Sequence, residues 1–445
     1  MARVLWVDGL KGMAAFLVAF NHYFKGFIND HERSFWDSPP EENRLWIQLP
    51  PFRLLWASHS MVPLFMVLSG YSLSLGLLKV RDTGRTFEFL LRVRRAIFRR
   101  PIRLYIPVII LAVLCELVFF FNLNFLGQHW ITYPPGASIW TILWIHTTNA
   151  VGYVADNMNI VDFLWNRGLN DQVWTMSLEF RGSYAVFLAI LALSPFRRDA
   201  RLCILTAISC FHLWYGNWDT FSFISGVHLA ELTSSSPTPT STPTKTASHS
   251  TTPSIPHPKP KSTHTNLLSY PSLLIGLYFL CLNGEGSLPP EYAFLDPIRT
   301  RHWTRYNIYV DQRFTWQAIG AVAFVYAIAN NRLFQRPFLT APLQYLGRLH
   351  LGIYILHILA FNIWREPFRD GIFRALAGQE YPEDHRAGEL PGAFWGAWVG
   401  SGVAIAGIVL VGAEVLNAVL VRCFAVVDRV EERFLERKGV VEKVD

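Results

Sequence analysis

Long apolar stretches separated by short polar segments dominate the chain. They lie near residues 10–28, 54–78, 103–122, 172–194, 202–217, 218–232, 267–284, 314–333, 347–366 and 394–420. A helix needs about 20 apolar residues to cross a hydrocarbon layer of ~30 Å, because each residue rises about 1.5 Å. The pattern therefore predicts an all-α fold, a polytopic transmembrane bundle of about ten helices. The adjoining stretches at 202–232 are the shortest of the set.

One further apolar stretch, residues 138–153, carries a run of polar residues. The run consists of His146, Thr147, Thr148 and Asn149. We interpret this stretch as interfacial or re-entrant, because polar groups at membrane depth need protein or water partners. If it crossed the membrane instead, the orientation of every later helix would reverse.

Polar segments divide the bundle without forming a second domain. Residues 233–265 consist almost wholly of Ser, Thr, Pro, Lys and His and include no acidic residue. This composition cannot bury enough apolar surface to fold, so we expect a disordered cytosolic loop within one membrane domain spanning 1–445. Residues 283–312 and 366–391 are expected to cap the opposite side. The first helix is expected to remain as a permanent span, because no small-residue cleavage site follows it.

Composition and charge support a multi-pass membrane protein. Apolar residues make up 51% and charged residues 16% of the chain, against roughly 25% charge in an ordinary soluble domain. Nine basic residues between Lys79 and Arg103 mark that segment as cytosolic. Both termini are then expected in the cytosol. The net charge of +7 thus indicates orientation in a lipid bilayer rather than a nucleic-acid partner.

The five cysteines lack any paired or metal-binding spacing. They are Cys115, Cys203, Cys210, Cys281 and Cys423, all within or beside apolar stretches. We therefore expect neither a disulfide framework nor a metal site.

His22 is the first candidate for chemistry. It follows Lys11 by eleven residues on one apolar helix, a rise of roughly 16 Å, which places it about halfway through the hydrocarbon layer. Ionisable groups at that depth are costly and usually functional. The other polar residues predicted at membrane depth are His59, Ser69, Glu116, Glu179, His228 and His357.

A buried histidine of this kind has a structural and a catalytic interpretation. The structural one is a ring hydrogen-bonded to a neighbouring helix. The catalytic one is a general base that takes the proton from a hydroxyl as its oxygen attacks a carbonyl, with a second group holding the imidazole. Several such residues at one depth favour catalysis, so we predict His22 as the base, supported by Glu179 or His357.

Arg100 and Arg103 form the second candidate group. They are three residues apart, flank Pro101, and are predicted at the cytosolic start of the third helix. Paired guanidinium groups suit bidentate capture of phosphates such as those of coenzyme A. The alternative is a membrane anchor of the type that basic residues commonly form.

Five motifs in order resemble the acyltransferase 3 family of integral-membrane acyltransferases, particularly its fungal branch. They are Trp6–Ala15 with His22, Val62–Tyr71, Arg100–Arg103, Gln172–Phe180 and Leu346–His357. Lys11 stands where many members have arginine, and His350 and Gly352 depart from the usual serine region.

The resemblance implies transfer of an acyl group, commonly acetyl from acetyl-CoA, to a hydroxyl of a small metabolite or a glycan. It implies that His22 is the catalytic histidine and that Arg100 and Arg103 handle acyl-CoA. Lys11 joins the donor-binding set, and Glu179 and His357 join the catalytic set. No metal is implied, and no appended esterase-like domain is expected.

Two other classes of protein fit a bundle with buried polar residues. A polytopic transporter of a small molecule would typically show symmetry between its halves, and the sequence shows none. A non-catalytic membrane scaffold would not need His22, Glu179 and His357 at a common depth. Formation of an acylated product distinguishes an acyltransferase from a transporter, which would move a solute without forming a new ester.

Overall fold

The computed structural model describes residues 4–28, 33–123, 132–161, 170–234, 263–282, 288–304 and 308–436. Throughout these ranges the regular structure is helical, which confirms the predicted all-α class. The α-helices are α1 Leu5–Phe24, α2 Met61–Arg81, α3 Thr86–Phe120, α4 Ile139–Asn157, α5 Thr175–Leu193, α6 Arg198–Trp214, α7 Trp218–Thr233, α8 Thr263–Leu280, α9 Ile308–Asn330, α10 Arg332–Gln335, α11 Ala341–Ala377 and α12 Pro391–Glu436. Most of the predicted loop at 233–265 lies outside the described residues.

Shorter 3₁₀ helices connect the α-helices. They are η2 Trp46–Gln48, η3 Phe52–Leu55, η4 Ser58–Ser60, η6 Asp171–Trp174, η7 Pro290–Ile298, η8 Arg301–Thr304 and η9 Arg336–Leu339. Among the described residues, five segments are long and apolar enough to cross a membrane, at 58–81, 86–120, 172–193, 341–377 and 391–431. The chain is therefore an integral membrane protein of the helical type.

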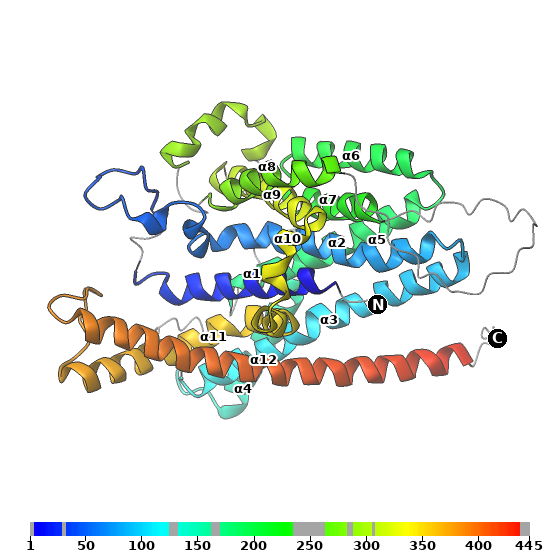
Figure 1. The fold of residues 1–445 in the computed structure, drawn as a ribbon. Coiled ribbons are helices and arrows are strands. Elements are labelled where there is room, and N and C mark those ends of the chain that lie inside the picture. The colour runs from blue at the N-terminus through cyan, green and yellow to red at the C-terminus, as the bar shows by residue number, and fades with distance from the viewer. Residues whose placement is uncertain are drawn as a thin grey trace, which may run out of the picture.

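The long helices lie side by side in one bundle. Figure 1 shows the axes of α1, α2, α3 and α12 roughly parallel to one another. Helices α6 and α7 lie on one side of the bundle and α12 lies on the other. The start of α1 and the end of α12 point toward the same end of the bundle. Between these layers α2 packs against both α1 and α7.

The third helix begins earlier than the sequence predicts. α3 starts at Thr86, so Arg100, Pro101 and Arg103 lie within it rather than at its start, and that prediction is wrong. A proline inside a helix leaves the carbonyl four residues earlier without its usual N–H donor. Here the hydroxyl of Tyr184 donates to that carbonyl, Ile97 O, at 3.1 Å. The neighbouring helix thus satisfies the group that Pro101 leaves unpaired.

The predicted cap at 366–391 is only partly correct. α11 continues to Ala377 before Gly378 ends it in the left-handed conformation. Its last turns persist because Arg369 stacks on Tyr381, with the guanidinium carbon 3.8 Å from the ring centre. The segment therefore contributes three helical turns to the bundle.

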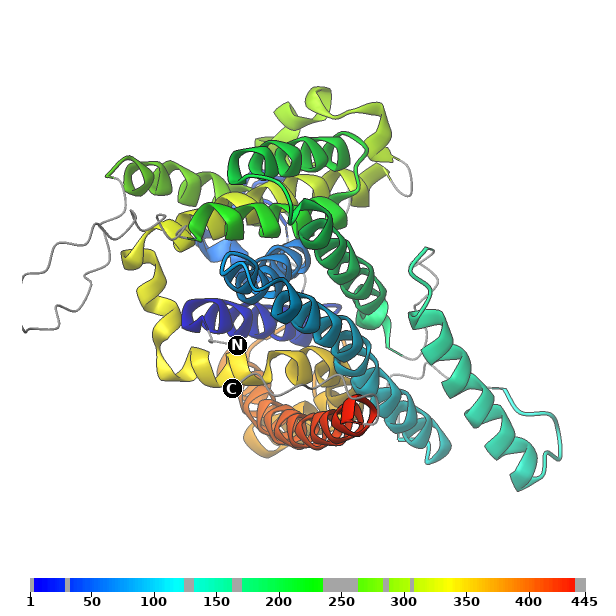
Figure 2. The same ribbon diagram turned by 90° about the vertical axis from the view of Figure 1, so that its right-hand side faces the viewer.

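Helix α4 occupies the stretch predicted as interfacial. Figure 2 shows it at the edge of the bundle, and it buries only His146, Tyr153 and Asn157. His146 Nδ1 lies 2.5 Å from the carboxylate of Glu116 on α3. A helix with one narrow buried face suits a position at the bundle edge, and its placement in the membrane stays a prediction.

Glycines let α1 and α11 lie in close contact. A Cβ on Gly347 would stand 2.2 Å from Asp8 O, and one on Gly12 would stand 2.5 Å from Gly347 N. Ten residues beyond Gly12 and Gly347 along the two helices, His22 meets His357. The helices therefore run in the same direction, and this register determines which side chains meet.

Candidate active site

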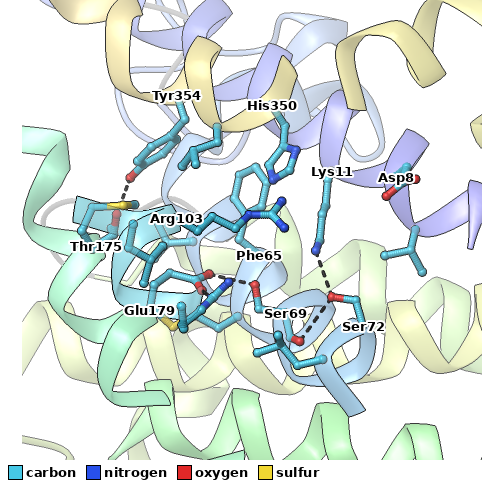
Figure 3. A pocket seen from close by; sticks show the side chains of 18 of the residues that line it. Asp8, Lys11, Phe65, Ser69, Ser72, Arg103, Thr175, Glu179, His350 and Tyr354 are labelled. Carbon is cyan, nitrogen blue, oxygen red and sulfur yellow. Dashed lines mark hydrogen bonds and ion pairs between the residues drawn. The ribbon is translucent and has the colours of Figure 1, made fainter. Parts of the chain in front are cut away.

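A cavity of about 280 Å³ lies among α1, α2, α3, α5 and α11. Its polar lining, much of it visible in Figure 3, comprises Asp8, Lys11, Ser69, Ser72, Arg100, Arg103, Thr175, Glu179, His350 and Tyr354. The structure thus brings four predicted site residues together. They are Lys11, Arg100, Arg103 and Glu179.

Arg100 is fully engaged by α5. Its Nε donates to Ser183 Oγ at 2.6 Å, and its Nη2 forms an ion pair with Glu179. Glu179 also accepts a hydrogen bond of 3.0 Å from Ser69. Because Glu179 and Ser183 are four residues apart on one helix face, they hold this guanidinium together, and its charge is largely neutralised.

Arg103 is placed differently from Arg100. Within the described ranges its guanidinium has no hydrogen bond and no ion pair, and Figure 3 shows it extended into the cavity. Across the cavity, Lys11 Nζ donates to Ser72 Oγ at 3.0 Å. Since Glu179 is occupied by Arg100, the remaining charges of the lining are the cations of Lys11 and Arg103 and the carboxylate of Asp8. This excess of positive charge suits an anionic ligand.

His22 and His357 form a hydrogen-bonded pair. His22 Nδ1 lies 2.9 Å from His357 Nε2, and the rings stack with centroids 5.2 Å apart. His357 Nδ1 lies 3.0 Å from the carbonyl of Ile353. A carbonyl only accepts, so neutral His357 carries its proton on Nδ1 and accepts at Nε2. His22 then donates from Nδ1, which leaves the lone pair of its Nε2 available.

The end of α1 is held in place around His22. Asn21 Nδ2 donates to Trp56 O at 3.2 Å, and Ser58 Oγ donates to Asn21 Oδ1 at 2.7 Å. Arg365 Nη1 donates to the carbonyls of Tyr23 at 3.0 Å and His22 at 3.3 Å. The Arg365 donors satisfy carbonyls that the end of α1 leaves without partners. The end of the helix that carries His22 is thus held by two segments, residues 56–58 and α11.

The histidine pair adjoins the cavity without lining it. Tyr354 lies between them, because it lines the cavity and its ring centroid is 6.1 Å from that of His357. Its hydroxyl lies 2.9 Å from Thr175 Oγ1 and donates to Gln172 O at 3.1 Å. Glu179 therefore lies with the arginines rather than beside the histidines. The six predicted residues form two neighbouring groups.

Sequence analysis did not single out Tyr354, Thr175 or Ser72. For Tyr354 a signal existed, because His350, Tyr354 and His357 follow the spacing of one helix face. Thr175 and Ser72 give no such signal, since hydroxyl residues are common in membrane helices.

Of the other polar residues predicted at membrane depth, His59 stays within electrostatic range of His22, and its ring centroid is 6.3 Å from that of Phe314. His228 Nε2 is 3.5 Å from Thr206 Oγ1. Glu116 pairs with His146 at the far end of α3. Within the ranges that the structure covers, no group of three or more His, Cys, Asp or Glu side chains is arranged to hold a metal.

The fold and this site define an all-α integral membrane protein with a polar, cation-lined cavity inside its bundle. The chain belongs to the acyltransferase 3 family, whose model, described as an acyltransferase domain, matches residues 4–413. The predicted family is thereby confirmed, and so is the predicted enzyme class, an acyltransferase, at the level of the family.

Fungal proteins are among its relatives. The chain is 28% identical to the O-acetyltransferase PaAT-1 of Phomopsis amygdali over 256 residues, which cover 51% of this chain and 48% of that protein. It is 21% identical to the acyltransferase clz18 of Cochliobolus lunatus over 395 residues, covering 79% of this chain and 81% of that protein. The first match thus spans about half of the relative's length. No solved structure matches the chain.

Proposed function

We propose that the protein is a membrane-bound O-acyltransferase that moves an acyl group, in the first instance acetyl, from acyl-CoA to a hydroxyl of a small metabolite or glycan. The observation that carries this proposal is the hydrogen-bond chain from Ile353 O through His357 to His22. It leaves His22 Nε2 as a base within a bundle that also holds a cation-lined cavity. Membership of the acyltransferase family supports the reaction class.

The catalytic step moves one proton and exchanges one bond. His22 Nε2 takes the proton of the acceptor hydroxyl while the oxygen attacks the thioester carbonyl. The resulting tetrahedral intermediate collapses with cleavage of the C–S bond, and the thiolate of CoA takes the proton back from His22. His357 accepts the Nδ1–H of His22 throughout, and so stabilises the imidazolium that forms. It is a positioning residue.

The cavity cations bind the donor. Arg103 and Lys11 supply the positive charge that faces the cavity, and the thioester end extends past Tyr354 toward His22. Arg100 and Glu179 neutralise each other, so their role is to fix the wall of the cavity and the direction of Arg103. The donor enters from the cytosol, where both termini are proposed to lie, in keeping with their common end of the bundle in Figure 1.

The test is acyl transfer by membranes carrying the protein. Membranes are incubated with radiolabelled acetyl-CoA and extracted fungal metabolites, and acylated products are separated by chromatography. His22→Ala is expected to lower transfer by roughly 10² to 10⁴, the usual contribution of a general base.

The matched control is His228→Ala, a histidine outside the cavity and the pair. It should transfer at the wild-type rate. Wild-type turnover by His22→Ala in a protein that inserts normally would refute the assignment of the base. Uptake of a solute by proteoliposomes with no new ester would refute the proposed function in favour of a transporter.

A further inference from the structure

A second cavity, of about 180 Å³, adjoins the first. It lies among α3, α11 and α12, and it shares Arg103, His350 and Leu351 with the first cavity. Arg103 therefore faces both spaces. The second cavity extends along α12 as far as Leu420 and Phe424, whereas no described residue of α12 lines the first cavity.

The polar side chains that line the second cavity are Arg103, Arg348, His350 and Asn417. Arg348 lines it and forms an ion pair with Glu414, in which both side chains are partly exposed, 47% and 37%. The Asn417 amide also lines it and has no hydrogen bond to the described part of the chain. His350 donates from Nδ1 to Gly347 O at 2.7 Å, which leaves its Nε2 as an acceptor.

We infer that this second cavity binds a phosphate group of the acyl donor between Arg103 and Arg348. The inference rests on the proposed function and changes the partner expected for Arg103. Arg100, the predicted partner of Arg103, forms an ion pair with Glu179 instead. Arg348, from a different helix, faces the same space as Arg103. Two guanidinium groups and the Asn417 amide form the donor set that a phosphate requires.

Substitutions of Glu414 and Arg348 should change the KM for acetyl-CoA in opposite directions if the site binds phosphate. Its carboxylate competes with an incoming phosphate for Arg348. Arg348→Gln is expected to raise the KM for acetyl-CoA roughly tenfold with kcat unchanged, as loss of one charged hydrogen-bond donor does. Glu414→Gln, which frees Arg348, is expected to lower that KM by about threefold. If the Arg348–Glu414 ion pair only stabilises the bundle, Arg348→Gln and Glu414→Gln will both lower activity.

The matched control is Arg374→Gln, at the other end of α11. Arg374 is exposed and pairs only with exposed Glu380 among the described residues, so its variant should keep the wild-type KM. Arg348→Lys keeps the charge and should recover part of the affinity. An unchanged KM in Arg348→Gln overturns the inference.

Two further arms identify the source of the phosphate. With S-acetylpantetheine, which lacks the nucleotide phosphates of CoA, Arg348→Gln should equal the wild type. An equal defect with both donors, which disappears in vesicles of phosphatidylcholine without phosphatidylglycerol, would assign the site to a lipid headgroup and overturn the donor assignment. Calorimetric measurement of CoA binding tests the phosphate site independently of the proposed acyl transfer. Arg348-dependent binding without acyl transfer would refute the function alone.

Discussion

Two arginines three residues apart have opposite environments. Arg100 donates to Ser183 and pairs with Glu179, whereas Arg103 lines both cavities. The sequence presents them as equivalent, and only the position of α5 distinguishes them. An arginine without an ion pair to the described part of the chain keeps its donors available to a ligand, which is why we propose Arg103 rather than Arg100 as the donor-binding residue.

A first prediction concerns the support of His22. His357→Ala removes the acceptor of the His22 Nδ1–H, so the ring loses both its fixed tautomer and a stabilising partner for its cationic form. We expect kcat to fall roughly 10- to 100-fold, as for loss of a hydrogen bond to a charged group. The KM for acetyl-CoA should hardly change, because His357 lies outside the donor cavity. Steady-state kinetics over both substrates measure the split.

His228→Ala is the control for that variant. It also removes a histidine from the bundle, but one on α7 whose Nε2 lies 3.5 Å from Thr206 Oγ1 on α6, and its kcat should remain close to that of the wild type. A rise in KM with unchanged kcat in His357→Ala would mean that His357 binds substrate rather than positioning the base.

Part of the site was predictable from single residues. His22 and His357 stood out because each is ionisable and far along an apolar helix, and the structure places them in contact. The partner of Glu179 was not predictable, because the depth of a residue says nothing of its rotation about the helix. Glu179 faces α3 and Ser69 rather than α1, and only tertiary packing determines that rotation.

At the scale of elements, the contact between α1 and α11 depends on glycine. Gly347→Ala would place a methyl group 2.2 Å from the backbone of Asp8, which is rigid, so the helices must separate. We expect a loss of roughly 1–3 kcal/mol in the free energy of unfolding, typical of overpacking. Acyl transfer should fall as well, because the same packing sets the register of His22 on His357. Thermal unfolding in detergent and the transfer assay measure the two effects.

Gly371→Ala is the matched control on the same helix. A Cβ there would meet nothing within 4 Å. Alanine should therefore leave activity intact and raise stability by up to about 1 kcal/mol, the difference in helix propensity. Equal behaviour of the two variants would show that the close approach of α1 to α11 is unimportant.

The attachment of α4 gives a second prediction at this scale. Glu116 accepts from His146 and Asn149, and His146 in turn lies 2.7 Å from the hydroxyl of Tyr133. Glu116→Ala leaves buried His146 and half-buried Asn149 without this acceptor, at a cost of about 1–3 kcal/mol. Hydrogen exchange in α4 should accelerate while the KM for acetyl-CoA stays the same. Glu88→Ala, at the exposed start of α3, is the control and should change neither.

The apolar pattern located the long helices of the described ranges but not every helix end, and it did not predict the short helix α10. It failed at α3 because the arginines before residue 103 resemble a cytosolic loop, yet Arg94 and Arg99 form ion pairs with Glu431 and Asp428 on α12. Pairing across helices lets a charged segment remain helical, and such pairing cannot be deduced from local composition. The end of α11 was missed for a related reason, since aromatic contacts of Arg369 support it.

At the scale of the whole molecule, the site lies between two groups of helices. Figure 1 shows α6 and α7 on one side and α12 on the other, and α2 connects the first group to the cavity. At the end of α2, Arg81 and Arg201 both hydrogen bond to the carboxylate of Glu231 on α7. This carboxylate is 2% exposed, so the three side chains tie α2, α6 and α7 together away from the chemistry.

Because Glu231 lies away from both cavities, its substitution should lower stability without changing donor binding. Glu231→Gln keeps the shape of the side chain but removes its charge, so the two buried guanidinium groups are left with Asp82 as their one shared carboxylate among the described residues. Loss of one partner of a buried ion pair costs about 3–5 kcal/mol, so the unfolding midpoint in detergent should fall sharply. Below that midpoint the KM for acetyl-CoA should equal the wild-type value, because Glu231 lines neither cavity. Asp199→Asn, a charge loss at the exposed start of α6, should cost less than about 1 kcal/mol. A donor-binding defect in Glu231→Gln would instead mean that α7 controls the shape of the site through α2.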